Sequence, residues 1–535
     1  MLTDRLRPHR GAVPTTDGAR WGAYPAPVRR SLELIQGLSP EGRDAFLYTC
    51  SAAFAGVTAF AVGIPLYRQW GQMAVGPYVL AAAVMAVTAW RLGAAGRAGP
   101  GRASDPSQRS ESAAMSAPDS DAAAVAGRTD ARRVKALRVL AFLIVLFGAT
   151  VLPLSMEVIW RSEGNAALHV QPEVVVVEQA GARAAQGKDP YQVVDRNGHI
   201  LIHESTEPIY ELYYPYLPGM VLFGFSSSDS KVEARLTDAR IQFLVFTAVV
   251  TVVALSRLRP RTDARVRALQ ALTVLPTAAL PLATGGDDMP VAALMLLGLV
   301  ALQRRRPVLA GLALGAASSL KFTAWPLVFF ALWAAYDLHR KRAAARYALG
   351  VAAVVVPVVV PVALRNPSAF VDNVVRFPLG LAGVSSPAAS ALPGHILVSL
   401  APGAHRAYVV VVGVLGCAVL ARHLVKRPPR SPADVARLTG WVMLIAILLA
   451  PATRVGYLLY PINLFVWAWM LRQADDPSPG EPATPEPDEA RGTPPGPGAA
   501  AHPPPQLSSG SSYSSTEYEV VPVDAVGETT TPTSQ

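Results

Sequence analysis

Two groups of ionisable residues border long apolar runs and are of types that suit acid–base or phosphate chemistry. Asp287 and Asp288 are adjacent carboxylates in a short connection between apolar runs, where ionised groups are costly unless they are hydrated, paired or used. Lys321 ends a run of apolar and small residues, and its ammonium could contact a phosphate at a membrane surface. Arg454 has a similar place beside a later run. These four residues are therefore candidate functional groups.

Each of these residues also has a simpler explanation. The two aspartates fit a hydrated turn, and the lysine and arginine fit long side chains that reach the interface without any substrate. Lys321 fits this explanation less well. It lies at the predicted outer end of its apolar run, whereas most other basic residues cluster in connections predicted on the cytoplasmic side. Carboxylate oxygens suit Mg²⁺ or Mn²⁺, but two acids are too few ligands, so no metal site is predicted.

A third group of candidate residues lies in the acidic segment 157–238, which is far longer than a connection requires. It contains a predicted short helix from Glu173 to Gln186, which also carries Glu178. A turn at Asp189-Pro190-Tyr191, a hairpin around residues 195–198 and a return through Tyr214 are predicted to follow. The aromatic residues of the return favour interfacial anchoring. An extracytoplasmic active site would suit this segment.

The amino-acid composition indicates the kind of structure that carries these candidate residues. Of 535 residues, 51% are hydrophobic and 16% are charged, whereas soluble domains carry about a quarter charged residues. The sequence therefore predicts an all-α polytopic membrane protein. The net charge of +10 does not indicate a nucleic-acid partner, because the arginines form short clusters between apolar runs rather than one soluble face. Cys50 and Cys417 lie in apolar segments without CxxC spacing, so neither a metal centre nor a disulfide framework is expected.

About twelve runs are long and apolar enough to be considered as membrane spans, since a spanning helix needs roughly 20 apolar residues. The runs between 288 and 320 are the shortest. The predicted spans are 45–66, 73–91, 135–156, 239–256, 268–285, 288–303, 307–320, 322–338, 345–364, 405–422, 436–451 and 456–472.

The basic clusters predict how the chain is oriented. They fall in alternate connections, at 257–267, 304–306, 340–342 and 422–427, and such clusters mark the cytoplasmic side. The connections at 285–288 and 451–454 then face outwards, and both termini are expected in the cytoplasm. No convincing small-residue cleavage site follows the first apolar run, so the first helix is expected to stay attached. We expect a multi-pass protein of the plasma membrane.

The domain organisation follows from these spans and from composition. We predict a cytoplasmic N-terminal segment (1–44), two additional transmembrane helices (45–92), a disordered cytoplasmic linker (93–133), a transmembrane body (134–472) that includes the extracytoplasmic loop 157–238, and a disordered cytoplasmic tail (473–535) rich in Pro, Ser and Thr. No function is assigned to the tail.

The order of several weak motifs resembles a known family. These are the Gly187-Lys188-Asp189-Pro190-Tyr191 turn, the return 213–218 (YYPYLP), the stretch 304–321 (RRRPVLAGLALGAASSLK) and the stretch 454–461 (RVGYLLYP). Together they resemble the GT-C membrane glycosyltransferases, specifically the GT87-like mannosyltransferases that depend on polyprenyl-phosphate-mannose. The resemblance covers roughly residues 135–472.

The resemblance implies a GT-C-like helix bundle with a large first extracytoplasmic loop in its catalytic body. It implies transfer of a hexose, with mannose favoured, from a polyprenyl-phosphate donor to an extracytoplasmic glycan or glycolipid acceptor, with no cofactor besides the lipid-linked sugar. Glu173 is the first choice for the base and Glu178 the second; Asp287 and Asp288 form a further candidate catalytic group. Substrate contacts are expected from Lys321, Arg454, Asp189, Tyr191, Tyr214 and Tyr457.

Two other classes remain open at this point. A transporter would also have about twelve helices, but it should show repeated halves and polar sites near the bilayer midplane, and neither is clear in the sequence. A non-catalytic membrane scaffold would suit the long polar tail but not the acidic outer loop. Nucleophilic hydrolysis is disfavoured because no GxSxG elbow is present.

Overall fold

The computed structural model describes residues 37–98, 119–164, 168–191, 209–225, 235–258, 262–382, 384 and 387–475. Within these residues the regular elements are helical, and one isolated parallel bridge joins Ala389 and Thr453. The all-α prediction is therefore confirmed for this part of the chain. The longer helices are α2 (Pro40–Ala61), α3 (Pro65–Ala98), α4 (Asp119–Val145), α5 (Leu152–Glu163), α6 (Pro172–Ala185), α8 (Ala239–Ser256), α9 (Thr262–Thr273), α10 (Pro276–Thr284), α11 (Asp288–Gln303), α12 (Pro307–Leu320), α13 (Trp325–Arg365), α15 (Pro393–Leu400), α16 (His405–Lys426), α17 (Pro432–Leu449) and α18 (Leu459–Asp475).

Many of these helices start where the sequence has a proline. Proline suits the first helical position, because the amide hydrogen that it lacks has no partner there and its fixed φ fits the helix. The helices α6, α10, α12 and α17 begin in this way, at Pro172, Pro276, Pro307 and Pro432. At α8 a side chain provides the cap, since Asp238 accepts a hydrogen bond of 3.0 Å from the backbone N–H of Arg240.

Pro153 lies inside a span and changes its geometry. The helices α4 and α5 are joined by a π-helical turn, Leu146–Val151, just before Pro153. Because Pro153 has no N–H, the carbonyl of Ala149 cannot receive the usual helical hydrogen bond. That carbonyl instead accepts a bond of 2.8 Å from the indole N–H of Trp70, which lies on α3. The irregular turn thus joins the first helices to the rest of the molecule.

The predicted number of spans is not confirmed. All twelve predicted segments fall on helices, but only seven helices of the described residues are long and apolar enough to cross a membrane, or eight if the bent pair α9–α10 is one span. The helices α11 and α12 have 16 and 14 residues. Their lengths are about 24 and 21 Å, below the roughly 30 Å of a hydrocarbon core. Since α11 is buried along most of its length, it packs inside the bundle and contacts little lipid.

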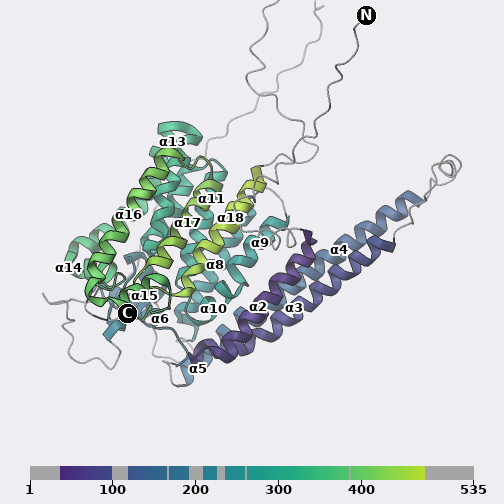
Figure 1. Cartoon of the computed structure of the whole chain (residues 1–535), viewed down its shortest axis with the longest axis horizontal. Helices are drawn as coiled ribbons and strands as arrows, with labels where there is room; N and C mark the ends of the chain where they lie inside the picture. Colours follow the sequence, from purple (N-terminus) through teal and green to yellow (C-terminus); the bar gives the residue numbers. More distant parts are fainter. Residues whose placement is uncertain are drawn as a thin grey trace, which may run out of the picture. The chain divides into compact units, whose positions relative to one another are not determined.

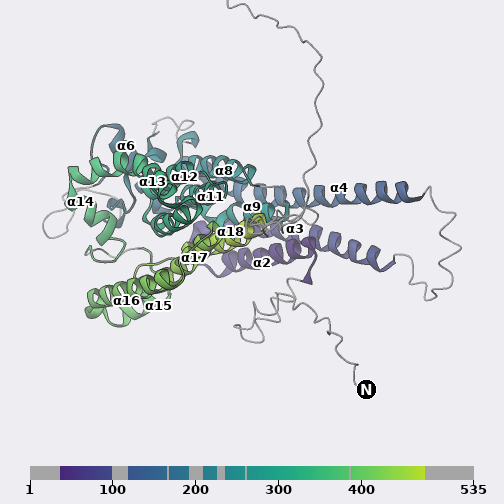
Figure 2. The same cartoon turned by 90° about the horizontal axis from the view of Figure 1, so that it is seen from above.

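The long helix α13 folds back on itself. The hydroxyl of Tyr347 donates a hydrogen bond of 2.8 Å to the carbonyl of Val328, although 19 residues separate them. In a straight helix these residues would be about 28 Å apart. The apolar segments 322–336 and 341–365 are therefore two arms, as the two predicted spans in this region required. Figure 1 shows α13 at one end of the bundle, and Figure 2 shows α8, α11, α12 and α13 as neighbours.

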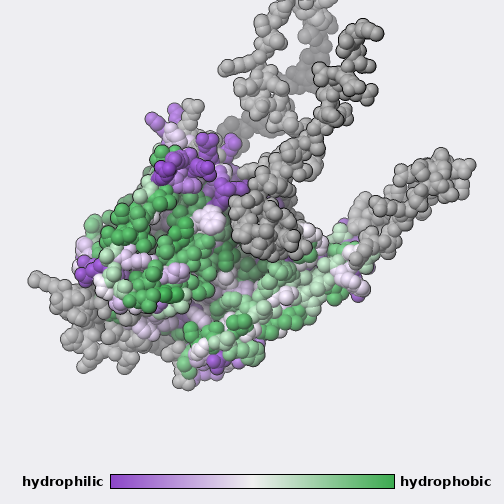
Figure 3. All heavy atoms as spheres, in the orientation of Figure 1, coloured by the Kyte–Doolittle hydropathy of each residue, from purple (hydrophilic) through white to green (hydrophobic). Residues whose placement is uncertain are grey.

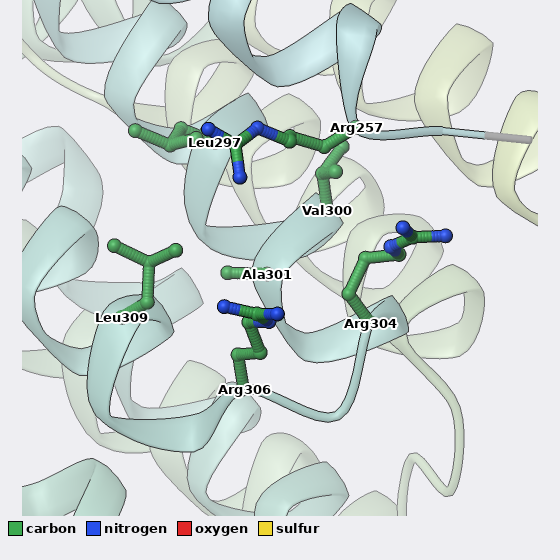
Figure 4. Close-up of a pocket in the computed structure, with 7 residues that line it drawn as sticks. All are labelled: Arg257, Leu297, Val300, Ala301, Arg304, Arg306 and Leu309. Carbon is green, nitrogen blue, oxygen red and sulfur yellow. The ribbon is translucent and has the colours of Figure 1, made fainter. Parts of the chain in front are cut away.

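The two ends of the bundle differ in charge as the sequence predicts. Arg257, at the end of α8, and Arg304 and Arg306, between α11 and α12, line one small cavity of about 40 Å³ (Figure 4). At the other end of the same two helices, Asp288 begins α11 and Lys321 follows α12. Between the ends, apolar side chains cover much of the visible surface (Figure 3). The helix α16 has no buried residue, so its side chains fit a lipid environment.

The linker predicted at 93–133 is shorter in the structure. The helix α3 continues to Ala98 and α4 begins at Asp119, so the prediction of disorder is wrong for 93–98 and 119–133. The alanine-rich stretch 121–127 favours helix over coil, which the composition argument overlooked. Residues 99–118, the predicted hairpin around 195–198 and the tail from 476 lie outside the described residues.

The packing of α12 against the second arm of α13 gives a first testable prediction. A Cβ added at Gly311 would overlap the backbone carbonyl of Tyr347, whereas a Cβ at Gly413, on α16, meets nothing within 4 Å. We expect Gly311→Ala to lower the free energy of unfolding in detergent by about 1–3 kcal/mol, because the two helix backbones must separate. Gly413→Ala is the matched control and should not destabilise the protein. Equal stability of the two variants would contradict the close packing.

Candidate active site

The helix α6 carries Glu173 in its first turn, directly after Pro172. Its other end lies against the turn Pro218–Gly224, where the two backbones meet at a pair of glycines. A Cβ added at Gly181 would overlap the backbone of Gly224, and one at Gly224 would overlap the carbonyl of Val177. Only glycine permits this approach. The local sequence thus fixes both where α6 begins and how closely it packs.

A set of ion pairs holds the outer side of α6; we call Arg161, Glu178, Asp238 and Arg240 the α6 anchor. Arg161 binds Glu178 at 2.6 Å and Asp238 at 2.8 Å, and Asp238 also binds Arg240 at 2.8 Å. Burial opposes the charge of Asp238, but Arg240 and Arg161 outweigh it and lower the pKa of Asp238 to about 2. Glu178 also accepts from the backbone N–H of Ala239 at 3.1 Å. The structure therefore places this second candidate base in a structural cluster.

Glu173, the first candidate base, forms an ion pair with Arg454. Arg454 precedes the 3₁₀ turn Val455–Leu458, and the two side chains are 281 residues apart in sequence but adjacent in space. Both are partly exposed, at 16% and 22% of the side chain. The second carboxylate oxygen of Glu173, Oε2, is buried and has no hydrogen-bond partner among the described residues.

Lys321 brings the two aspartates together; we call Asp287, Asp288, Lys321 and Tyr460 the lysine cluster. The Lys321 ammonium lies 3.0 Å from Asp287 Oδ2 and 2.5 Å from Asp288 Oδ1. Tyr460 donates a hydrogen bond of 2.6 Å to Asp288. The ammonium also lies 5.0 Å from the ring centroid of Tyr216 and 5.8 Å from that of Tyr457, which are cation–π distances.

The charges of the lysine cluster depend on one another. Burial alone would lower the pKa of Lys321, but the carboxylates of Asp287 and Asp288 outweigh it and raise the pKa, so the ammonium stays protonated. Burial raises the pKa of Asp287, Lys321 opposes this shift, and the neighbouring Asp288 adds to it. Two carboxylates against one ammonium leave the cluster formally negative when all three are ionised. The N-terminus of α11 partly offsets this charge.

A cavity of about 220 Å³ lies between α6 and the lysine cluster. Glu173, Lys321, Arg454 and Tyr457 all line it, so the structure brings together four of the ten predicted site residues. Asp287 and Asp288 lie behind Lys321 and are buried. The remaining wall is aromatic and proline-rich, and is formed by Pro172, Val176, Tyr210, Tyr213, Pro215, Tyr216, Phe322, Thr323, Val374, Phe377, Pro378, Pro387, Ala388 and Ala452.

Three predicted contacts lie away from the cavity. Asp189 accepts from the backbone N–H of Tyr191 at 2.9 Å and so closes the turn. Tyr191 is buried and donates to the carbonyl of Tyr216 at 2.8 Å. Tyr214 is also buried, with its ring 5.5 Å from that of Tyr191. Tyr191 thus supports the return 213–218, in which Tyr214 is buried while Tyr213 and Tyr216 line the cavity.

The sequence reasoning missed several cavity residues. Phe377 stacks on Tyr213 with centroids 4.6 Å apart, and Thr323 donates to Tyr460 at 2.7 Å. Thr323 lies two residues after Lys321, a proximity that could have indicated it. Phe377 follows the second arm of α13, and nothing in its local sequence indicates an outer cavity.

The site holds no evident metal-ligand group. Among the residues that the structure describes, no three His, Cys, Asp or Glu side chains are grouped so that they could hold a metal ion. The facing oxygens of Asp287 and Asp288 are occupied by the Lys321 ammonium.

Fold and site together define a multi-pass membrane protein with a charged cavity at one end of its helices. Comparison with known proteins then indicates a class of enzyme. Residues 234–451, somewhat less than half of the chain, match the model of glycosyltransferase family 87. This match confirms the predicted resemblance to glycosyltransferase family 87 over these residues, and it supports a membrane glycosyltransferase. No curated protein and no solved structure matches the chain.

The matched region contains only part of the site. Asp287, Asp288 and Lys321 lie inside residues 234–451. Glu173 precedes the match and Arg454 follows it by three residues. The cavity therefore joins a lysine cluster from the matched body to an acid and an arginine from segments on either side.

The lysine cluster gives the second prediction. Lys321→Met leaves two buried carboxylates without their cation, so we expect the free energy of unfolding in detergent to fall by about 3–5 kcal/mol. Lys188→Met, at an exposed lysine of the outer turn, should change it by less than about 0.5 kcal/mol. Adding Asp287→Asn and Asp288→Asn to Lys321→Met should recover part of the loss. A Lys321→Met protein as stable as wild type would show that the cluster is not held by charge.

Proposed function

We propose that this glycosyltransferase moves a hexose, with mannose favoured, from a polyprenyl-phosphate donor to an extracytoplasmic glycan or glycolipid acceptor. The observation that supports the proposal is the convergence of Glu173, Lys321 and Arg454 on one cavity. Transfer from a lipid phosphate needs a group that takes the acceptor proton and cations that stabilise the departing phosphate. The cavity has both kinds of group and is lined by Lys321 and Phe322, which lie between apolar helices that a polyprenyl chain could contact.

The size and lining of the cavity fit a small polar head. Its volume of about 220 Å³ is below the roughly 300–1,000 Å³ of sites that enclose drug-sized ligands. One sugar unit and its phosphate are therefore the expected occupants, with the rest of the acceptor outside. Aromatic rings such as those of Tyr213 and Phe377 offer apolar faces to a sugar ring.

In the proposed reaction, Glu173 takes the proton of an acceptor hydroxyl as that oxygen attacks the anomeric carbon. The bond between this carbon and the phosphate oxygen breaks, and its electron pair leaves with the polyprenyl phosphate. Lys321 and Arg454 stabilise the phosphate charge. Both cations are already paired with carboxylates, so donor binding requires an exchange of partners. When Arg454 turns to the phosphate, Glu173 is released to act as a base.

The same proposal places the cavity at the outer face of the plasma membrane, with both termini in the cytoplasm. The charge difference between the two ends of α11 and α12 supports this orientation, because arginine-rich connections face the cytoplasm. A lipid-linked donor would then reach the cavity from the outer leaflet.

Removal of the proposed base is the third prediction. Glu173→Gln keeps the size of the side chain but cannot take a proton, so we expect kcat to fall by about 10²–10⁴-fold. The measurement is transfer of labelled mannose from polyprenyl-phosphate-mannose in membranes or proteoliposomes. Glu163→Gln is the matched control, since its carboxylate is 59% exposed and lies outside the cavity. Wild-type rates in Glu173→Gln would reject Glu173 as the base.

The orientation gives the fourth prediction. After both native cysteines, Cys50 and Cys417, are replaced by serine, a single cysteine is introduced at Lys188 or at Arg304. An impermeant thiol reagent should label position 188 on intact cells and position 304 only after permeabilisation, because the two lie in connections predicted on opposite sides. The reverse pattern would place the cavity in the cytoplasm and reject the proposed donor.

A further inference from the structure

The two helices that precede the transmembrane body are firmly attached to it. Asp44 of α2 is 1% exposed and binds Arg138 of α4 at 2.7 Å and Arg267 of α9 at 2.5 Å. On α3, Trp70 donates to the carbonyl of Ala149, and Tyr78 donates to that of Val274. These contacts hold α3 against the helices that lead to the site. A side chain at the outer start of α3 therefore has a defined position relative to the cavity.

Tyr67 is that side chain. Its phenolic oxygen accepts a hydrogen bond of 3.0 Å from the side-chain amide of Gln171. Its phenol also lies within electrostatic reach of the guanidinium of Arg454, the partner of Glu173. This side chain of α3 thus binds the residue that directly precedes α6 and lies near the guanidinium that pairs with the proposed base.

Gln171 extends this contact to the other half of the site. Its backbone N–H donates to the carbonyl of Thr284 at 3.1 Å, and its side-chain amide donates to the Thr284 hydroxyl at 2.7 Å. Its side chain also packs on Gly285, where an added Cβ would overlap it. Gly285 is two residues before Asp287. Gln171 therefore fixes the start of α6 and the turn that carries the lysine cluster.

We infer that Tyr67 is a positioning residue of the transfer reaction, and that α3 is part of the active-site framework. The inference rests on the proposed function. Tyr67 does not line the cavity, so it acts through Gln171 and Arg454 rather than on substrate. It lies far before the region that matches family 87, and the two helices α2 and α3 thereby gain a role in the reaction besides membrane attachment.

The test compares Tyr67→Phe with Tyr78→Phe. Each removes one phenolic hydroxyl from α3, and each hydroxyl binds a group of the body, but only that of Tyr67 reaches the site. We expect Tyr67→Phe to lower kcat by about 10–100-fold with little change in the KM for the lipid donor, because small displacements of reacting groups cost rate. Tyr78→Phe should keep kcat within a few-fold of wild type. An equal loss of kcat in both variants would overturn the inference in favour of a structural role.

A second measurement does not depend on activity. Hydrogen–deuterium exchange of the purified protein should rise at the start of α6 and around residues 452–458 in Tyr67→Phe, and should be unchanged there in Tyr78→Phe. Unchanged exchange in Tyr67→Phe would overturn the inference whatever the transfer rates. If wild-type protein transfers no sugar from polyprenyl-phosphate donors, the proposed function fails, and a local rise in exchange would still support Tyr67 as the residue that holds this end of α6.

Discussion

Every charged side chain that lines the candidate site lies at the end of an apolar helix bundle and is paired with an opposite charge. Lys321 is 8% exposed, and an ammonium so buried is tolerated only because two carboxylates face it. Glu173 and Arg454 satisfy the same requirement as a pair. Each charge that lines the cavity is therefore neutralised before substrate arrives. In the proposed reaction a charged donor replaces one of these partners, which links its binding to release of the proposed base.

This exchange needs rigid surroundings, because a freed carboxylate must not follow its former partner. The α6 anchor holds one side of the helix, and the contact between Gly181 and Gly224 holds another. At the first turn, Gln171 and Tyr67 provide the third support. These three supports hold the backbone of α6 while, in the proposed reaction, side chains at its start change partners. The lysine cluster is supported likewise by Tyr460 and by the N-terminus of α11.

The sequence indicated the parts of this site better than their connections. The predicted segments 173–186 and 307–320 agree with α6 and α12, whereas α17 begins four residues before the predicted span 436–451. Asp287, Asp288 and Lys321 were proposed as site residues from local context, and Glu173 from the family resemblance. Local context could not pair Glu173 with Arg454, since 281 residues separate them, nor predict that Tyr67 reaches both sides of the site. The count of twelve spans was not confirmed because hydropathy alone also counted α11, α12, the first arm of α13 and α18, which are shorter than the helices that qualify as spans. Short apolar helices inside a bundle are as hydrophobic as spans, and burial by neighbouring helices decides between the two.

The region that matches the family does not contain all the residues of the candidate site. The match contains the lysine cluster, whereas Glu173, Arg454 and Tyr67 come from segments before and after it. If the first helices served only to anchor the chain, their contacts with the body would be apolar or would lie along the span. Instead the Tyr67 hydroxyl of α3 binds Gln171, which directly precedes α6, and lies near Arg454, the partner of Glu173. In the proposed mechanism the functional unit is thus larger than the matched region, because Glu173 precedes this region and Arg454 follows it.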